Sequence, residues 1–115
     1  MGMAFPKEPK KPKRKKHKKS IIHQKDGTCY LCCMNGDYSQ KRTEEHHVFG
    51  GPNRHISEAE GLTVYLCIDH HREGPEAVHR NKKTMDMLHI IGERAYERTH
   101  SRQQFYELFG RFYED

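Results

Sequence analysis

The chain of 115 residues is long enough for one domain, but its composition leaves little material for a hydrophobic core. Hydrophobic residues make up 33% of the sequence, charged residues make up 32%, and tryptophan is absent. No apolar run approaches the roughly 18 residues of a membrane span, and no apolar segment follows the charged N-terminus as in a signal peptide. We therefore expect a small domain that needs a further source of stability.

The net charge of +5 is concentrated at the N-terminus. Residues 1–20 carry nine Lys or Arg and one acidic residue, a charge of +8, whereas the rest of the chain carries −3. This composition, with three prolines, predicts a disordered tail that binds DNA phosphates, or else a merely solubilising tail. We place the folded domain at 21–115. The predicted phosphate-binding residues are Lys10, Lys11, Lys13, Arg14, Lys15, Lys16, Lys18 and Lys19.

Two half-sites for a metal follow the tail. Cys29 and Cys32 are separated by two residues, and Cys67 and His70 repeat this spacing downstream. The pattern predicts one tetrahedral structural zinc site, whose binding, on the order of 10 kcal/mol in zinc-finger peptides, would stabilise a small core. Metal ligands rather than disulfides also predict a reducing, cytoplasmic location. Cys33 is an alternative ligand, but we favour Cys32, because the two-residue separation lets both thiolates point into one turn.

A double histidine lies between the half-sites. His46 and His47 end a strand-like run over Lys41–Val48. Neighbouring side chains of a strand point to opposite faces, so we expect the two imidazoles to have different roles. Residues 50–52 (Gly-Gly-Pro) predict a loop, and Leu62–Leu66 predicts a second strand that leads into the second half-site.

The segment after the second half-site predicts helices. Gly74 and Pro75 interrupt any helix that begins at His71, and Pro75 suits the first turn of a new helix that would carry His79. Apolar residues at steps of three and four then predict a helix over Thr84–Arg98.

Ser101 is expected to cap a further helix with the same apolar spacing. The resulting helical part, 75–115, would pack over the strands and the zinc knuckle, 29–71. We expect the remaining histidines to be packing or surface residues: His23, His55, His89 and His100.

This order of motifs resembles the HNH endonucleases, the ββα-metal nucleases. The segments EEHHVFGGPNRH and LTVYLC, with the basic tail, are most similar to small phage or prophage HNH proteins and to the recombination-enhancement (Ref-type) nucleases of temperate phages. The resemblance covers about Cys29 to His79. It implies an α+β fold: a small zinc-stapled ββα-metal domain with C-terminal helices and a disordered basic N-terminal tail.

The resemblance also implies roles for the histidines that the zinc site leaves over. His46 would bind the catalytic metal, His47 would activate water as the general base, and His71 with His79 would supply the further metal ligands. The family has a middle Asn before the second strand that is absent here, and Asn53 is the candidate to replace it.

The chemistry of these residues agrees with such a role. An imidazole, with an ordinary pKa of about 6.5, suits a base that takes a proton from water. Neutral imidazoles suit Zn²⁺, Ni²⁺ or Mn²⁺, and Mg²⁺ when phosphate and water complete its shell. We expect a metal-dependent endonuclease in the cytoplasm of a phage-infected host, with a recombination protein as a further partner. Its substrate would be DNA, with single-stranded and branched forms among the candidates. The alternatives are a non-catalytic zinc module that binds nucleic acid and a recombination adaptor.

Overall fold

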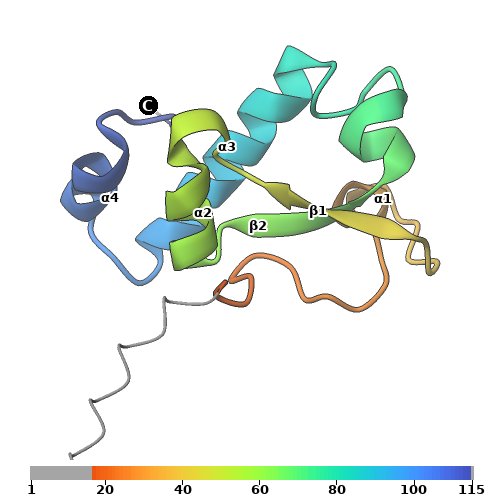
Figure 1. The fold of residues 1–115 in the computed structure, drawn as a ribbon, viewed down its shortest axis with the longest axis horizontal. Coiled ribbons are helices and arrows are strands. Elements are labelled where there is room, and N and C mark those ends of the chain that lie inside the picture. Colours follow the sequence, from red (N-terminus) through yellow and green to blue (C-terminus); the bar gives the residue numbers. More distant parts are fainter. Residues whose placement is uncertain (1–16, 115) are drawn as a thin grey trace, which may run out of the picture.

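The computed structural model describes residues 17–114, in which a two-stranded sheet is surrounded by helices (Figure 1). This arrangement confirms the expected α+β class for the described part of the chain. Residues 1–16, with the tail side chains from Lys10 to Lys16, lie outside it. The elements in chain order are α1 (Tyr30–Met34), β1 (Thr43–His47), the 3₁₀ turn η1 (Gly51–Asn53), α2 (Arg54–Glu60), β2 (Thr63–Cys67), the π-helical turn η2 (Asp69–Glu73), α3 (Lys82–Glu97) and α4 (Arg102–Phe109).

Both expected strands are present and form an antiparallel hairpin. Thr43 lies opposite Cys67, and His46 lies opposite Val64. Gly61 ends α2 with a φ of +73°, a conformation that favours glycine, and a Cβ there would lie 2.5 Å from the carbonyl oxygen of Lys19. The chain can therefore turn sharply from α2 into β2.

The loop that we expected between the strands contains a short helix, α2, so this prediction is wrong in part. Pro52 occupies the first turn of η1, where its missing N–H is not needed. The hydroxyl of Ser57 accepts a hydrogen bond from the N–H of Phe49 and donates one to its carbonyl oxygen. These tertiary bonds hold α2 against the end of β1, and His55 therefore lies exposed on a helix.

The expected helix from Pro75 is also wrong, because residues 75–80 form turns. The N–H groups of Val78 and His79 donate to the carbonyl oxygens of His70 and His71, which ties this segment back onto η2. The helix α3 begins only after Asn81, whose side chain caps it by accepting a hydrogen bond from the N–H of Thr84.

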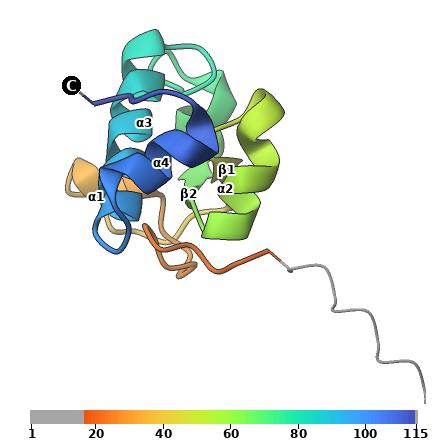
Figure 2. The same ribbon diagram turned by 90° about the vertical axis from the view of Figure 1, so that its left-hand side faces the viewer.

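The two C-terminal helices confirm the periodicity of the sequence. Helix α3 covers almost all of the predicted range, and Ser101 caps α4 in a reciprocal box with Gln104. Figure 2 shows α2 and α3 on opposite sides of the hairpin. Gly92 of α3 permits close approach, because a Cβ there would lie 2.8 Å from Val48 and 2.9 Å from the ring of Phe49.

The buried core joins the hairpin to α3 and α4. Phe49 is 1% exposed, and its ring centroid lies 4.5 Å from that of Phe109. Three of the remaining histidines pack on aromatic rings as expected: His23 on Tyr30 and Tyr65, His89 on Phe49, and His100 on Tyr96. The other fully buried apolar side chains of the core include Val48, Leu62, Val64, Leu66, Val78, Leu88 and Phe105.

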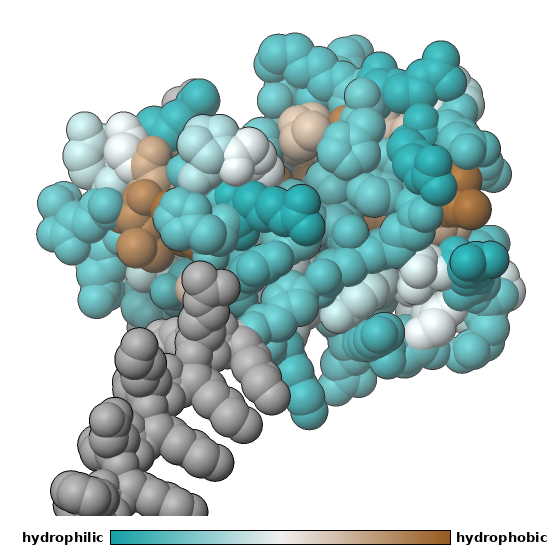
Figure 3. Space-filling model, viewed as in Figure 1, coloured by the Kyte–Doolittle hydropathy of each residue, from teal (hydrophilic) through white to brown (hydrophobic). Residues whose placement is uncertain are grey.

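The last residues of the expected disordered tail lie against α2 and β2. Lys18 donates its N–H to the carbonyl oxygen of Glu58 at 3.1 Å, and the hydroxyl of Ser20 donates to the carbonyl oxygen of Thr63. The surrounding surface is mostly hydrophilic, with apolar side chains visible near α4 and at the opposite end of the molecule (Figure 3). Within residues 17–114, no helix has the length and apolar character that crossing a membrane requires.

Candidate metal centres

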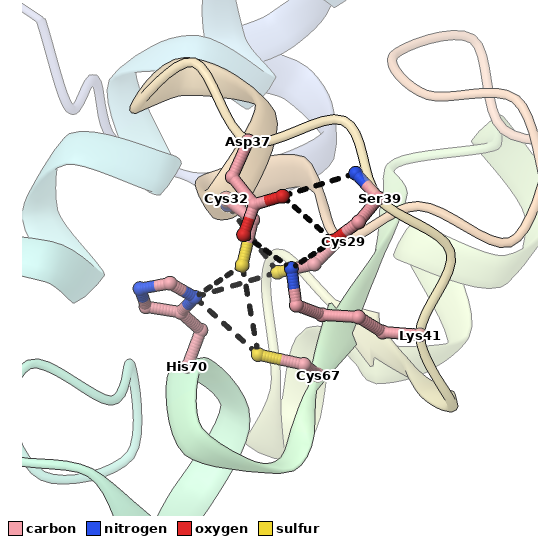
Figure 4. A network of polar contacts seen from close by, with 7 residues as sticks. All are labelled: Cys29, Cys32, Asp37, Ser39, Lys41, Cys67 and His70. Carbon is pink, nitrogen blue, oxygen red and sulfur yellow. Dashed lines mark hydrogen bonds and ion pairs between the residues drawn. The ribbon is translucent and has the colours of Figure 1, made fainter.

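The four expected zinc ligands converge at one end of the hairpin (Figure 4). The Nδ1 atom of His70 lies 3.5 Å from the sulfur of Cys29 and 3.4 Å from those of Cys32 and Cys67. The sulfurs of Cys32 and Cys67 are 3.9 Å apart. A tetrahedral zinc ion would separate two sulfurs by about 3.8 Å and sulfur from nitrogen by about 3.6 Å. The ligand set and its spacing therefore fit zinc.

Local structure explains why these ligands meet. Cys29 is the N-cap of α1, and its sulfur accepts a hydrogen bond from the N–H of Cys32 one turn later. Cys67 ends β2, and His70 follows on η2. Cys33 is not part of the cluster. The two half-sites thus fasten α1 to the end of the hairpin.

The surroundings of the thiols determine their protonation. Burial raises the pKa of Cys32 to about 12, so this thiol would remain protonated without a metal. The pKa of the nearby Lys41 is raised, first by its hydrogen bond to Asp37 and then by its contact with Cys32. A zinc ion bound here would hold the thiols as thiolates, with the Lys41 ammonium nearby to offset their charge.

Three further imidazoles form a second cluster. His46 of β1, His71 of η2 and His79 of the turn before α3 each offer a ring nitrogen, and these atoms lie within 4.8 Å of one another. The Nε2 atoms of His71 and His79 are 3.1 Å apart. The Nε2 atom of His46 is buried and has no hydrogen-bond partner in residues 17–114. A cation among the three rings would satisfy this atom, so the cluster fits a divalent metal.

Burial and neighbouring rings keep two imidazoles of this second cluster, His46 and His79, in the neutral state that binds metals. Burial, and then the neighbouring rings of His71 and His79, lower the pKa of His46 to about 3. Burial and the ring of His71 also lower the pKa of His79. These imidazoles are therefore neutral near pH 7, and neutral imidazoles are common ligands of transition metals.

A carboxylate that the sequence reasoning missed supports the second cluster. Nδ1 of His71 donates to Glu44 at 2.8 Å, and Arg72 holds the same carboxylate through two hydrogen bonds of 3.0 and 2.9 Å. Arg72 and then His71 lower the pKa of Glu44 to about 2. Metal-binding histidines commonly have such a carboxylate partner. Glu44 precedes His46 by two residues on one strand, and this spacing was a visible signal that both share a face.

His47 lies apart from the second cluster. Its Nε2 atom is 3.0 Å from Oε1 of Glu58 on α2, and its ring stacks on that of His17 at 5.8 Å. The alternation of strand side chains accounts for the separation from His46. Glu58 is the side chain that holds this ring. No local pattern in the sequence indicated Glu58, because only the fold of α2 brings it to β1.

A hollow adjoins the second cluster at His79. Its volume is about 370 Å³, and it opens between the end of β1 and α3. Aromatic and backbone groups form its walls, so it offers space for a substrate group beside the histidines. The lining residues are Phe49, Gly50, Gly51, Asn53, His79, Met85, His89 and Tyr113.

Comparison with known proteins adds no relative. No family model matches the chain, and neither a curated protein nor a solved structure matches it. The function must therefore be argued from the residues and their geometry.

Proposed function

We propose that the chain is a metal-dependent DNA endonuclease of the HNH type, with a zinc-stapled ββα-metal domain. The observation that carries the proposal is the convergence of His46, His71 and His79, with the buried Nε2 of His46 lacking a partner. The cluster joins a β-hairpin to the helical turn that follows it, which is the arrangement that the resemblance to HNH nucleases implies. A role in phage recombination or DNA processing rests on that resemblance alone.

The second cluster would hold the catalytic cation. A divalent metal bound there supplies positive charge that stabilises the scissile phosphate and the leaving oxygen. Glu44 orients His71 so that Nδ1 carries the proton and Nε2 faces the cluster. Zn²⁺, Ni²⁺, Mn²⁺ and Mg²⁺ are the candidate ions, and neutral nitrogen ligands favour the transition metals among them.

His47 would take the proton from the attacking water. Glu58 accepts a hydrogen bond from the Nε2–H of this ring, which leaves Nδ1 unprotonated and able to act as the base. Because β1 ends at His47, a DNA strand that crosses this end would meet His46 on one face and His47 on the other. The tail would strengthen binding through phosphate contacts, and Lys18 and Lys19 are exposed beside the hairpin.

One observation favours a second candidate function. His47 is paired with Glu58 and lies outside the cluster of His46, as in a structural role without catalysis. The chain would then be a non-catalytic zinc-containing module that binds nucleic acid, or a recombination adaptor. Deleting residues 1–16 should weaken DNA binding and reduce its salt dependence under either function.

A substitution at the base separates the two functions. We expect His47→Ala to slow cleavage of supercoiled plasmid about 10²-fold or more, the usual contribution of a general base. It should keep the zinc of the Cys3His cluster and the DNA affinity of the wild type, and His55→Ala, a change in an exposed histidine of α2, should cleave normally. Equal rates in His47→Ala and wild type would remove His47 from the mechanism. Binding without cleavage in any metal would favour the non-catalytic module.

A further inference from the structure

A third group of metal-ligand side chains lies on the face of β1 opposite His46. His17, His47 and Glu58 each offer one ligand atom, and the three atoms lie within 4.8 Å of one another. None of these residues belongs to the two clusters described above. His17 comes from the segment before the domain, His47 from the end of β1, and Glu58 from α2. Three separate parts of the chain are therefore brought together here.

The geometry of this group suits zinc. Two imidazoles and one carboxylate form a ligand set that zinc uses when a fourth position stays open. Tetrahedral zinc would separate nitrogen and oxygen ligands by about 3.3 Å, and Nε2 of His47 already lies 3.0 Å from Glu58. The rings of His17 and His47 are nearly parallel, with an interplanar angle of 20°. The side chain of His17 is 40% exposed and has room to adjust.

The two faces of β1 repeat one arrangement. On one face, Glu44 holds His71 beside the strand histidine His46. On the other face, Glu45 lies 2.6 Å from Nε2 of His17, which stacks on the strand histidine His47. In each case, a carboxylate two residues before the strand histidine orients an imidazole from another part of the chain. The sequence Glu-Glu-His-His thus builds one potential metal site on each face.

We propose that His17, His47 and Glu58 bind a zinc ion that is distinct from those of the other two clusters. The bound ion is coordinated both by the ring of His47 and by the carboxylate of its partner, Glu58. If the proposed nuclease function holds, zinc at this third site prevents His47 from accepting a proton, and cleavage stops. The site would then make activity depend on free zinc concentration.

Zinc stoichiometry tests the site without any reference to activity. Equilibrium dialysis of the full chain against micromolar zinc, followed by metal analysis, should give three zinc ions per chain. His17→Gln and Glu58→Gln should each bind two, while His55→Gln, an exposed histidine outside all three groups, should keep three. Equal zinc content in the wild type and in both variants would overturn the proposal. Because His17 and Glu58 are substantially exposed, neither change should unfold the domain.

Inhibition tests the consequence for catalysis. With Mg²⁺ or Mn²⁺ supporting cleavage, added zinc should stop the wild type over the concentration range in which the third ion binds. His17→Gln should remain active over that range. Equal inhibition of both proteins would refute the regulatory role. If the wild type cleaves DNA under no condition, the nuclease proposal fails, whereas the stoichiometry still decides whether the third site exists.

Discussion

Nδ1 of His71 lies 2.8 Å from Oε1 of Glu44, and this hydrogen bond fixes which nitrogen of the ring faces the second cluster. The carboxylate is itself held by Arg72, so its position does not depend on a bound metal. The second cluster is therefore oriented before a cation arrives, and the cost of ordering its ligands on binding is reduced.

We predict that Glu44→Gln weakens metal binding at the second cluster by about 10-fold to 100-fold, the usual effect of losing such a partner. The amide is neutral and does not accept the Nδ1–H of His71 as strongly. Calorimetric titration with Ni²⁺ of protein that holds zinc only at the Cys3His cluster measures the change, and Glu107→Gln, an exposed change on α4, serves as the control. Unchanged affinity would mean that the pairing does not support the cluster.

The Cys3His cluster should determine whether the domain folds. Cys67→Ser removes one ligand and should cause loss of zinc and unfolding, because zinc binding supplies on the order of 10 kcal/mol in comparable small domains. Cys33→Ser, which leaves all four ligands in place, should keep both zinc and fold. Circular dichroism and metal analysis report the two properties. A folded Cys67→Ser protein without zinc would contradict a structural role.

Close packing of α3 on the hairpin gives a prediction that opposes helix propensity. Gly92→Ala should destabilise the fold by about 1 to 3 kcal/mol, because the added methyl group meets Val48 and Phe49. Propensity alone would predict a gain of about 1 kcal/mol for alanine in a helix. Gly50→Ala, where a Cβ meets nothing within 4 Å, should be nearly neutral. Urea unfolding of both variants measures the difference, and a more stable Gly92→Ala protein would contradict this packing.

Glu97 at the end of α3 predicts a pH dependence of stability. Burial, and then the adjacent Glu93, raise its pKa from 4.5 to about 7. Between these values the folded chain holds a proton that the unfolded chain has lost, so this group's contribution to stability falls as pH rises from about 4.5 to 7. Glu97→Gln removes that fall and should stabilise the protein by about 1 kcal/mol above pH 7.

Thermal unfolding at pH 5 and pH 8 measures this difference. The variant should gain stability over the wild type at pH 8 and little at pH 5, while the exposed control Glu107→Gln should show no such contrast. An equal change at both pH values would show that Glu97 is not protonated in the folded chain.

Features encoded locally were predictable from the sequence. The spacing of Cys29 and Cys32 indicated the knuckle, the apolar run Leu62–Leu66 indicated the second strand, and apolar periodicity indicated the helices α3 and α4. Helix α2 was missed because the bonds between Ser57 and Phe49 that hold it are tertiary. The turns after Pro75 were mistaken for a helix because backbone bonds back to η2 compete with helix formation.

The residues of the candidate sites divide in the same way, into those that local sequence patterns indicate and those that only the tertiary fold brings together. His46, His71 and His79 were named from the sequence, and the structure brings them together. The partners Glu44 and Glu58 were not named. Glu44 was accessible from strand alternation, whereas Glu58 depends on how α2 folds back.

The most direct test of the nuclease account measures cleavage of supercoiled plasmid and of single-stranded circular DNA. Protein that holds zinc only at the Cys3His cluster should be compared in Mg²⁺, Mn²⁺, Ni²⁺ and added Zn²⁺, with His46→Ala and the exposed control His55→Ala alongside. We predict cleavage that requires a second divalent metal, persists in His55→Ala, and is lost in His46→Ala while the Cys3His zinc is retained. Cleavage that is independent of metal, or equal in His46→Ala and wild type, would contradict the account.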